Sequence, residues 1–306
     1  MFFSFFKRQI RPYDSGYLPP LNGHEIFYHQ FGNPNGKIIL SFHGGPGGCS
    51  KEKHASHFDL KKYRIILFDQ RGCGKSLYKD RLSHNTTQDC IMDGIRVLEH
   101  LGIGGKIIVA GGSWGSTLAL LFAQKYPERV SKLIVNSIFL AGATDLEWMK
   151  KNSRLFYPDF LDKFNEEAGG EHLSKYTHKL LQSKKKKDND KALRGYGSYE
   201  KLMGSVNPKL PEGPFTEANM SYPTIFFHYD SNEYFIKYDQ ILKECHKISH
   251  IPTFIFHNRL DMNCPIQNAW DLHKALPKSK MYIIPSHGHG SKLMFDTMEK
   301  VLKEKL

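Results

Sequence analysis

The stretch "VAGGSWGSTLAL", Val109 to Leu120, places three glycines and a tryptophan around one serine, directly after an apolar run. Glycine is unfavourable inside strands and helices, so this cluster indicates a piece of backbone that other residues would not tolerate. The run before it predicts a buried strand, and the pattern after it, which stops at Pro127, predicts a helix. The stretch therefore predicts a strand, a tight turn at Ser113 and a helix.

This order matches the Gly-x-Ser-x-Gly turn, in which a strained corner presents a serine hydroxyl at the top of a parallel sheet. Side chains beside the serine would collide with the neighbouring strand and helix, which explains the glycines. The helix that follows directs its free amide groups and its positive dipole end at the same place. We expect Ser113 to be a nucleophile.

A nucleophilic serine needs a base, a group that orients the base, and donors for the oxyanion. In this architecture the acid and then the histidine follow the serine, each on a loop after a strand. Asp261 follows the predicted strand "IPTFIFHN" and His289 follows "KMYIIP", so we expect them to be the orienting acid and the general base. Asp271 is less suitable because it lies inside a helical pattern. We prefer His289 to His287 because a glycine precedes it and the terminal helix follows.

The stretch "SFHGGPGG", Ser41 to Gly48, follows another predicted strand, where a loop for the oxyanion belongs. We expect the backbone amides of Gly45 and Trp114 to form the oxyanion hole, and Gly44 to contact the substrate. Losing one such donor costs about 2.7–4 kcal/mol of transition-state stabilisation. Neither this loop nor "RGCGKS", Arg71 to Ser76, has the glycine spacing of a phosphate-binding loop.

The remaining pattern alternates strands with helices, which predicts the α/β class. Nearly continuous apolar runs predict strands buried on both faces of a mostly parallel sheet; they lie at 24–31, 37–42 and 63–69, and begin again near residues 106, 132, 251 and 280. Helical patterns cover 87–101, 116–126 and 267–275, with a terminal helix from Ser291. Between 143 and 245 the buried-strand signature disappears. We therefore predict a core at 1–142 and 246–306 with a mostly helical insertion at 143–245.

Composition excludes several classes of protein. The five cysteines are scattered and show no disulfide or zinc spacing, and the sixteen histidines include no His-Glu-x-x-His motif. We expect no metal and no cofactor, and reduced thiols in a cytoplasm. The formal charge of +12 is locally dense only at 184–187, next to acidic residues and without interleaved aromatics. We interpret this block as a solvated loop, and expect no nucleic-acid partner.

The phenylalanine-rich start, 2–6, precedes its basic residues, which is the reverse of a secretory signal, and is too short to span a bilayer. We expect no stable membrane insertion, although a weak foothold on a membrane surface is an alternative. The sequence does not determine the oligomeric state.

Taken together, the motifs resemble the proline iminopeptidases, a family of α/β-hydrolases. The resemblance covers most of the chain and is densest over 11–140 and 245–290, with the motifs "SGYL", "GNPNGK", "HGGPGG", "YRIILFDQRGCGKS", "HNTT", "GGSWGSTLAL", "AQKYPERV", "HIPTFIFHNRLDMNCP", "AWDLHKALP" and "IPSHGHG". It implies an α/β-hydrolase fold with a helical cap, and removal of N-terminal proline from short peptides by the Ser113, His289 and Asp261 triad through an acyl-enzyme.

The family binds the charged imino group of its substrate with glutamates of the cap. "YGSYE", ending at Glu200, resembles one of its motifs with tyrosines in place of tryptophans. The second glutamate motif is altered: in "FFHYDSNEYF" one alignment puts Phe226 at the expected position and the other puts Ser231 there. Either Glu233 or Asp230 is a candidate to compensate.

Two other functions remain open from the sequence. An esterase or amidase with an altered cap would use the same chemistry. A catalytically idle hydrolase fold that binds a partner through its basic cap would not need the strained serine turn.

Overall fold

The computed structural model describes residues 10–169, 173–183, 185–204 and 217–305. The phenylalanine-rich start, Lys184 and the Pro/Gly-rich stretch at 206–215 lie outside the described residues.

The core is a mostly parallel sheet. Its eight strands among the described residues are, in spatial order, β1 (Asp14–Tyr17), β3 (Phe27–Gly32), β5 (Tyr63–Phe68), β4 (Lys37–Phe42), β7 (Ile107–Ser113), β8 (Val130–Ile138), β9 (Thr253–Leu260) and β10 (Ser279–His287). β1 and β3 run antiparallel to their neighbours, and every pair from β5 to β10 is parallel. The sequence prediction of a mostly parallel sheet is confirmed.

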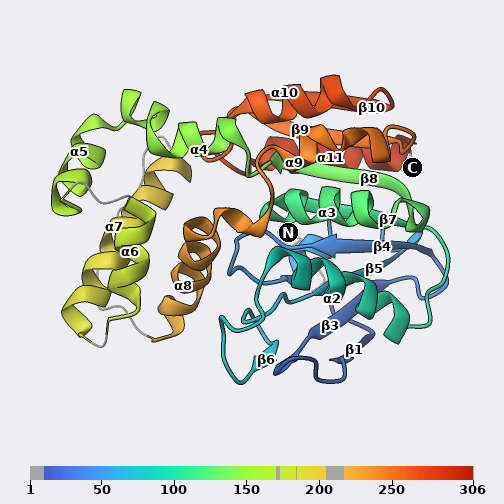
Figure 1. Ribbon diagram of the computed structural model, residues 1–306. Helices are drawn as coiled ribbons and strands as arrows, with labels where there is room; N and C mark the ends of the chain where they lie inside the picture. Colours follow the sequence, from blue (N-terminus) through green and yellow to red (C-terminus); the bar gives the residue numbers. More distant parts are fainter. Residues whose placement is uncertain (1–9, 170–172, 184, 205–216, 306) are drawn as a thin grey trace, which may run out of the picture.

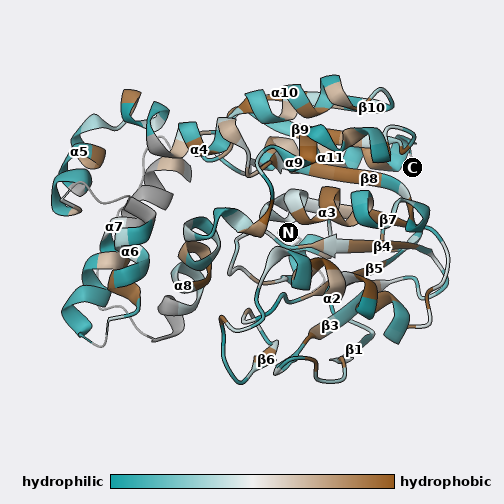
Figure 2. Cartoon of the chain, in the orientation of Figure 1, coloured by the Kyte–Doolittle hydropathy of each residue, from teal (hydrophilic) through white to brown (hydrophobic). Residues whose placement is uncertain are grey.

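Helices cover both faces of this sheet (Figure 1). They are α1 (Glu52–Ala55), α2 (Thr87–His100), α3 (Trp114–Lys125), α10 (Ile266–Ala275) and α11 (Lys292–Lys305), with 3-10 turns η1 (Pro127–Arg129) and η4 (Cys245–Ile248). α2, α3 and α10 pack in one apolar cluster with β4, β7 and β8, and α1 and α11 pack in a second cluster. Figure 2 shows apolar residues along strands such as β8 and hydrophilic ones along the outer helix α10.

The edge of the sheet differs from the sequence prediction. The run predicted as one strand at 24–31 divides at Ile26 into β2 (His24–Glu25) and β3, because β2 pairs with the short β6 (Leu77–Tyr78) instead of joining the main sheet. The strand β1 carries no apolar run and was not predicted. Its backbone pairs with β3 through alternating half-buried and exposed residues, as expected of an edge strand.

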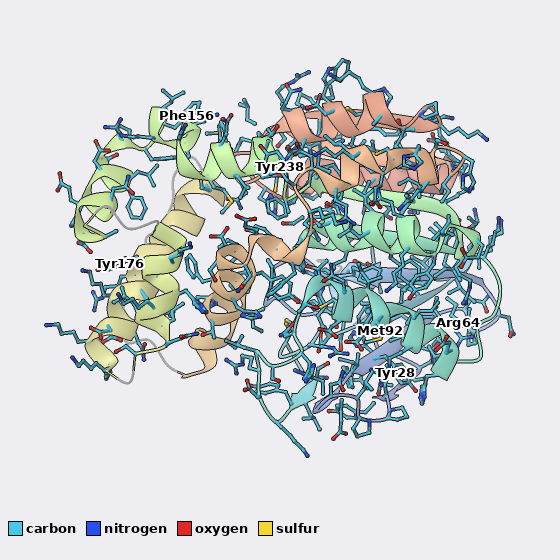
Figure 3. The ribbon with its side chains drawn as sticks, viewed as in Figure 1. Tyr28, Arg64, Met92, Phe156, Tyr176 and Tyr238 are labelled. Atoms are coloured by element: carbon cyan, nitrogen blue, oxygen red, sulfur yellow. The ribbon has the colours of Figure 1, made fainter. Side chains whose placement is uncertain are left out.

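A helical segment separates β8 from β9. It contains α4 (Ala143–Lys150), η2 (Asn152–Leu155), α5 (Pro158–Glu167), α6 (Leu173–Leu181), α7 (Lys186–Gly204), α8 (Glu217–Ser231), η3 (Glu233–Phe235) and α9 (Gln240–Lys243). Figure 1 shows α4 to α8 on one side of the core. Figure 3 shows Phe156 and Tyr176 on this segment, Tyr238 where it meets the core, and Tyr28 and Arg64 at the opposite end of the molecule. None of the helices described here is long and apolar enough to cross a membrane.

The buried histidines predict how stability depends on pH. Burial lowers the pKa of His29 and of His54 to about 4, from about 6.5 in an unfolded chain. Between these values the unfolded chain binds more protons than the folded one, so the free energy of unfolding falls as the pH is lowered. Burial raises the pKa of Asp145 to about 7, so this one group makes the free energy of unfolding rise as the pH is lowered. Burial also lowers the pKa of His43, His57 and His257, and these three histidines act in the same direction as His29 and His54.

We therefore expect urea denaturation to show lower stability at pH 5 than at pH 7.5. His29→Gln should reduce this difference, because it removes one of the groups that cause it. His250→Gln, at an exposed position, is the matched control and should leave the difference unchanged. Equal or greater stability at pH 5 would contradict the assignment.

Candidate active site

Ser113 occupies a strained corner between β7 and α3. Its backbone has φ 57° and ψ −129°, a conformation that a residue with a side chain rarely adopts. The flanking glycines make this corner possible: a Cβ on Gly111 would lie 2.0 Å from the carbonyl oxygen of Gly115, and one on Gly115 would lie 2.2 Å from that of Phe42. A Cβ on Gly112 would lie 2.5 Å from Asn136 Oδ1. The structure thus gives the glycine spacing a steric cause.

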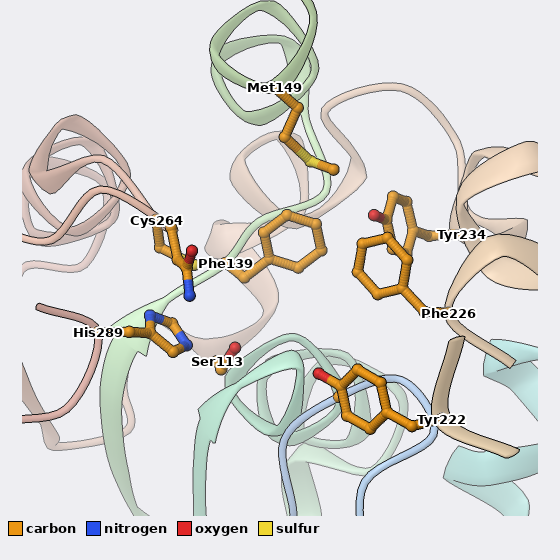
Figure 4. Close-up of a pocket in the computed structure, with 10 residues that line it drawn as sticks. Ser113, Phe139, Met149, Tyr222, Phe226, Tyr234, Cys264 and His289 are labelled. Carbon is orange, nitrogen blue, oxygen red and sulfur yellow. The ribbon is translucent and has the colours of Figure 1, made fainter. Parts of the chain in front are cut away.

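Asp261 and His289 come together at the carboxyl ends of β9 and β10. His289 Nδ1 lies 3.1 Å from Oδ1 and 3.0 Å from Oδ2 of Asp261. Because an ionised carboxylate only accepts hydrogen bonds, the proton is on Nδ1 and Nε2 is left unprotonated. Figure 4 shows the imidazole facing the Ser113 hydroxyl. This arrangement leaves His289 able to accept a proton from the serine.

The carboxylate of Asp261 is held from several sides. Its Oδ1 accepts the backbone N–H groups of Asn263 and Cys264, each at 3.0 Å. His257 lies beneath it, with Nε2 3.8 Å from Oδ2. The Ile138 amide donates to His257 Nδ1 at 3.0 Å, so Nε2 carries the proton and donates to the Cys264 carbonyl at 2.9 Å. Burial lowers the pKa of His257, so it is a neutral donor that helps to fix the Asp261 loop.

A buried polar network positions the glycine-rich loop after β4. The Gln70 amide donates to His43 Nε2 at 3.0 Å, so His43 carries its proton on Nδ1 and donates it to the Gly44 carbonyl at 2.8 Å. The Gln70 side chain donates to the His43 carbonyl at 2.9 Å and accepts from Trp114 Nε1 at 3.0 Å. Gly45 has φ +137°, which favours glycine. The network therefore links the loop directly to the residue after Ser113.

Trp114 is the first residue of α3, so its backbone N–H has no partner within the helix. Gly45 and Ser113 line the same pocket. A Cβ added to Gly44, the predicted substrate residue, would lie 3.5 Å from Ser113 Cβ. The roles of Gly45 and Trp114 as oxyanion donors stay predictions.

A pocket of about 90 Å³ opens over Ser113. Its described lining is mainly apolar and aromatic and includes Phe139, Met149, Tyr222, Phe226 and Tyr234. Figure 4 shows the rings of Tyr222, Phe226 and Tyr234 on the wall opposite His289. These side chains come from β8, α4, α8 and η3 and their adjoining loops, so the helical segment supplies most of the pocket wall.

Cys264 lines the pocket beside Ser113, and burial raises the pKa of its thiol well above its usual value. The thiol therefore stays protonated and is a poor nucleophile at neutral pH.

The structure does not bring every predicted residue to the pocket. Glu233 lies in η3 with an exposed side chain and is not among the described pocket residues. The backbone of Glu200 lies in α7, and its side chain is outside the described part of the structure. Asp230, the alternative to Glu233, is buried and accepts a hydrogen bond from the pocket residue Tyr234 at 3.1 Å.

Several functional residues were not found from the sequence. Gln70 and His43 belong to recognised motifs, but their role depends on contacts across the chain that no spacing reveals. His257 reads as an ordinary strand residue. Phe139 and Tyr222 lie in apolar patterns that equally predict core packing.

The sheet order and the serine corner above it define an α/β hydrolase, and the family model for the alpha/beta hydrolase fold matches residues 37–293. More specifically, the chain belongs to the proline iminopeptidase family. It is 38% identical over 293 residues to "Probable proline iminopeptidase" of Leptolyngbya boryana, covering 92% of this chain and 90% of that one. It is 37% identical to a proline iminopeptidase of Xylella fastidiosa, covering 92% and 93%, and 36% identical to one of Arabidopsis thaliana, covering 92% and 76%.

Solved structures share the fold at low sequence identity. The structure titled "probable hydrolytic enzyme" of Pseudomonas aeruginosa aligns with a TM-score of 0.67 and 18% identity, covering 96% of this chain and 94% of that one. A proline iminopeptidase-related protein of Thermus thermophilus aligns with a TM-score of 0.61 and 16% identity, covering 96% and 97%. The fold and the family resemblance inferred from the sequence are both confirmed.

The glycine contacts predict the effect of a single methyl group. Gly115→Ala would place a Cβ 2.2 Å from a backbone oxygen of the neighbouring strand. We expect a loss of at least about 3 kcal/mol in unfolding free energy, because backbone has to move. Gly105→Ala is the control, since nothing lies within 4 Å of its added Cβ, and should change stability by less than about 0.5 kcal/mol. Similar stability of the two variants in urea would refute the steric explanation.

Proposed function

We propose that this protein is a serine aminopeptidase that releases N-terminal proline from short peptides. The observation that carries the proposal is the Asp261–His289 pair facing a strained Ser113 beneath an apolar pocket, in a chain of the proline iminopeptidase family. Ser113 is the nucleophile, His289 the general base and then acid, and Asp261 the residue that orients it.

In the first half of the reaction, Ser113 Oγ attacks the carbonyl carbon of the substrate while His289 Nε2 takes its proton. The Gly45 and Trp114 amides stabilise the negative charge that develops on the carbonyl oxygen. His289 then gives the proton to the leaving amine, and the acyl group stays on Ser113. The Asp261 carboxylate stabilises the positive charge on His289 between these two transfers.

The pocket chemistry suits a compact apolar ring. Phe139, Phe226 and Met149 offer apolar surface to the pyrrolidine of proline. The charged imino group needs negative partners in a partly desolvated site. We propose Glu200 for this role. Asp230 is a further candidate, because its carboxylate is buried and hydrogen-bonded to a tyrosine of the pocket wall.

We further infer that 1–142 and 246–306 form the catalytic core and that 143–245 form a cap that limits entry to short peptides. The helical segment between β8 and β9, whose residues line the pocket, supports this division. All five cysteines are free thiols, which supports a cytoplasmic location.

An esterase or amidase acting on apolar acyl groups is the second candidate. The observation that favours it is Phe226 in the pocket wall, at one of the two positions where the family motif would place a glutamate.

Ser113→Ala tests the chemistry. Without the hydroxyl no acyl-enzyme forms, so kcat for proline β-naphthylamide should fall by at least about 10³-fold. Ser131→Ala, at an exposed position near the start of β8 and outside the described pocket lining, is the control and should retain activity. Turnover of p-nitrophenyl esters with no prolyl release by the unmodified protein would overturn the aminopeptidase proposal in favour of the esterase.

Glu200→Gln tests the recognition of the imino group. Removing the negative charge should raise KM for proline β-naphthylamide at least about tenfold, since charged hydrogen bonds contribute about 1.5–3 kcal/mol. Glu233→Gln removes the same charge from the exposed position and should change KM less than about twofold. The reverse ranking would assign the role to Glu233.

A further inference from the structure

A second cavity lies against the same catalytic residues. It has a volume of about 210 Å³, and its described lining includes Ser41, Asn136, Ala110 and His57. The residues that line both this cavity and the pocket over the serine are Ser113 and His289. We call it the rear chamber. The two reacting side chains therefore stand between two separate spaces.

The sequence of three strands explains why the rear chamber exists. On the sheet face that packs against α1 and α11, alternate residues point inward, as Ile39 and Ile134 do. Two residues further along, near the carboxyl ends of β4 and β8, the residues on this same face are Ser41 and Asn136. The row on β7 between them continues as Gly112, which has no side chain. The apolar core thus gives way to small and polar groups directly beneath the serine corner.

Ser41 and Asn136 bring polar side chains to the rear chamber. Neither side chain makes a hydrogen bond to the described part of the chain. Both side chains are half-buried, so water reaches them, and ordered water is the usual partner of polar groups in a cavity of this kind. At roughly 30 Å³ for each water, the rear chamber has room for several.

Three histidines of the rear chamber have a lowered pKa, which favours their neutral form at neutral pH. Burial lowers the pKa of His54 to about 4 and also lowers the pKa of His43 and His57. His57 stacks on Phe295 with ring centroids 4.4 Å apart. A space lined by neutral donors and acceptors suits water better than it suits an ion.

We propose that the rear chamber supplies the water that hydrolyses the acyl-enzyme. This inference rests on the proposed function only in that Ser113 carries an acyl group. The pocket over the serine is small and mainly apolar, so the acyl group fills it and displaces water there. The rear chamber stays open to His289 while the acyl group is bound.

The step is a balanced hydrolysis. The water oxygen attacks the carbonyl carbon of the ester, and His289 Nε2 takes one water proton. The bond between that carbon and Ser113 Oγ then breaks, and His289 returns the proton to Oγ. The products are a free carboxylic acid and the original serine.

The test replaces polar side chains of the rear chamber by apolar ones. The double variant Ser41→Val/Asn136→Leu keeps side-chain volume nearly constant at Asn136, adds a methyl group at Ser41 and removes both polar groups. With an activated prolyl ester we expect deacylation to slow at least about tenfold, because water loses its binding site. kcat should fall while kcat/KM stays within about twofold, and acylated Ser113 should accumulate, visible as a burst and by mass spectrometry.

Ile108→Val is the matched control, since it changes the same sheet face one row below the rear chamber, at a buried residue that does not line it. It should leave deacylation unchanged. An equal fall in kcat and kcat/KM without acyl-enzyme would mean that the double variant displaces the triad, and would overturn the proposal. Unchanged deacylation would overturn it as well.

Two further measurements distinguish a failure of this proposal from a failure of the proposed function. If the unmodified protein turns over p-nitrophenyl acetate but no prolyl ester, the proposed specificity for proline is wrong. The rate of deacylation of the acetyl-enzyme can then be compared between the unmodified protein and the double variant in the same way. A high-resolution crystal structure of the unmodified protein should show water bonded to Ser41 and Asn136. A dry rear chamber would refute the proposal even if the double variant does not fold.

Discussion

The constraint on which this molecule depends is the close approach of three backbone segments at Ser113. β7, the first turn of α3 and the loop after β4 come so near that a single Cβ at Gly111 or Gly115 would overlap a carbonyl oxygen. This close packing of backbone holds the strained conformation of Ser113. Ser113 and the glycine-rich loop after β4 are therefore parts of one packed unit, and the Gln70 hydrogen bonds join them again through buried side chains.

The pair Asp261 and His289 comes from other strands, and hydrogen bonds from β8 connect it to this unit. Asp261 and His289 follow β9 and β10, far from Ser113 in the sequence. The Ser137 hydroxyl at the end of β8 donates to the His289 carbonyl at 2.6 Å, and the Ile138 amide next to it donates to His257 at 3.0 Å. β8 thus fixes both the histidine loop and the support of the aspartate. This explains how the geometry of the predicted triad is maintained although Ser113 lies far from the other two members in the sequence.

The sequence predicts the parts of this site whose cause is local. Gly111 and Gly115 are needed by the backbone within one turn, so their spacing is visible in the sequence. The continuous apolar runs predict the parallel strands for the same reason. β1 and β6 were missed because their pairing, and not their composition, makes them strands. Glu233 was a candidate on alignment alone, and its exposure follows from the turn in which it lies, which no residue pattern announces.

That turn also shows how the pocket wall is fixed to the core. Glu233, Tyr234 and Phe235 have φ values of 51°, 55° and 52°, and each such residue costs about 1–3 kcal/mol. Thr87 and Gln88, at the start of α2, donate to the carbonyls of Tyr234 and Phe235 at 2.5 and 2.7 Å. The Tyr234 ring is thereby held against Trp114, with centroids 5.7 Å apart. Because the same tryptophan follows Ser113, the pocket wall and the proposed oxyanion donor, the Trp114 amide, have a common support. A change in this turn should therefore affect both substrate choice and rate.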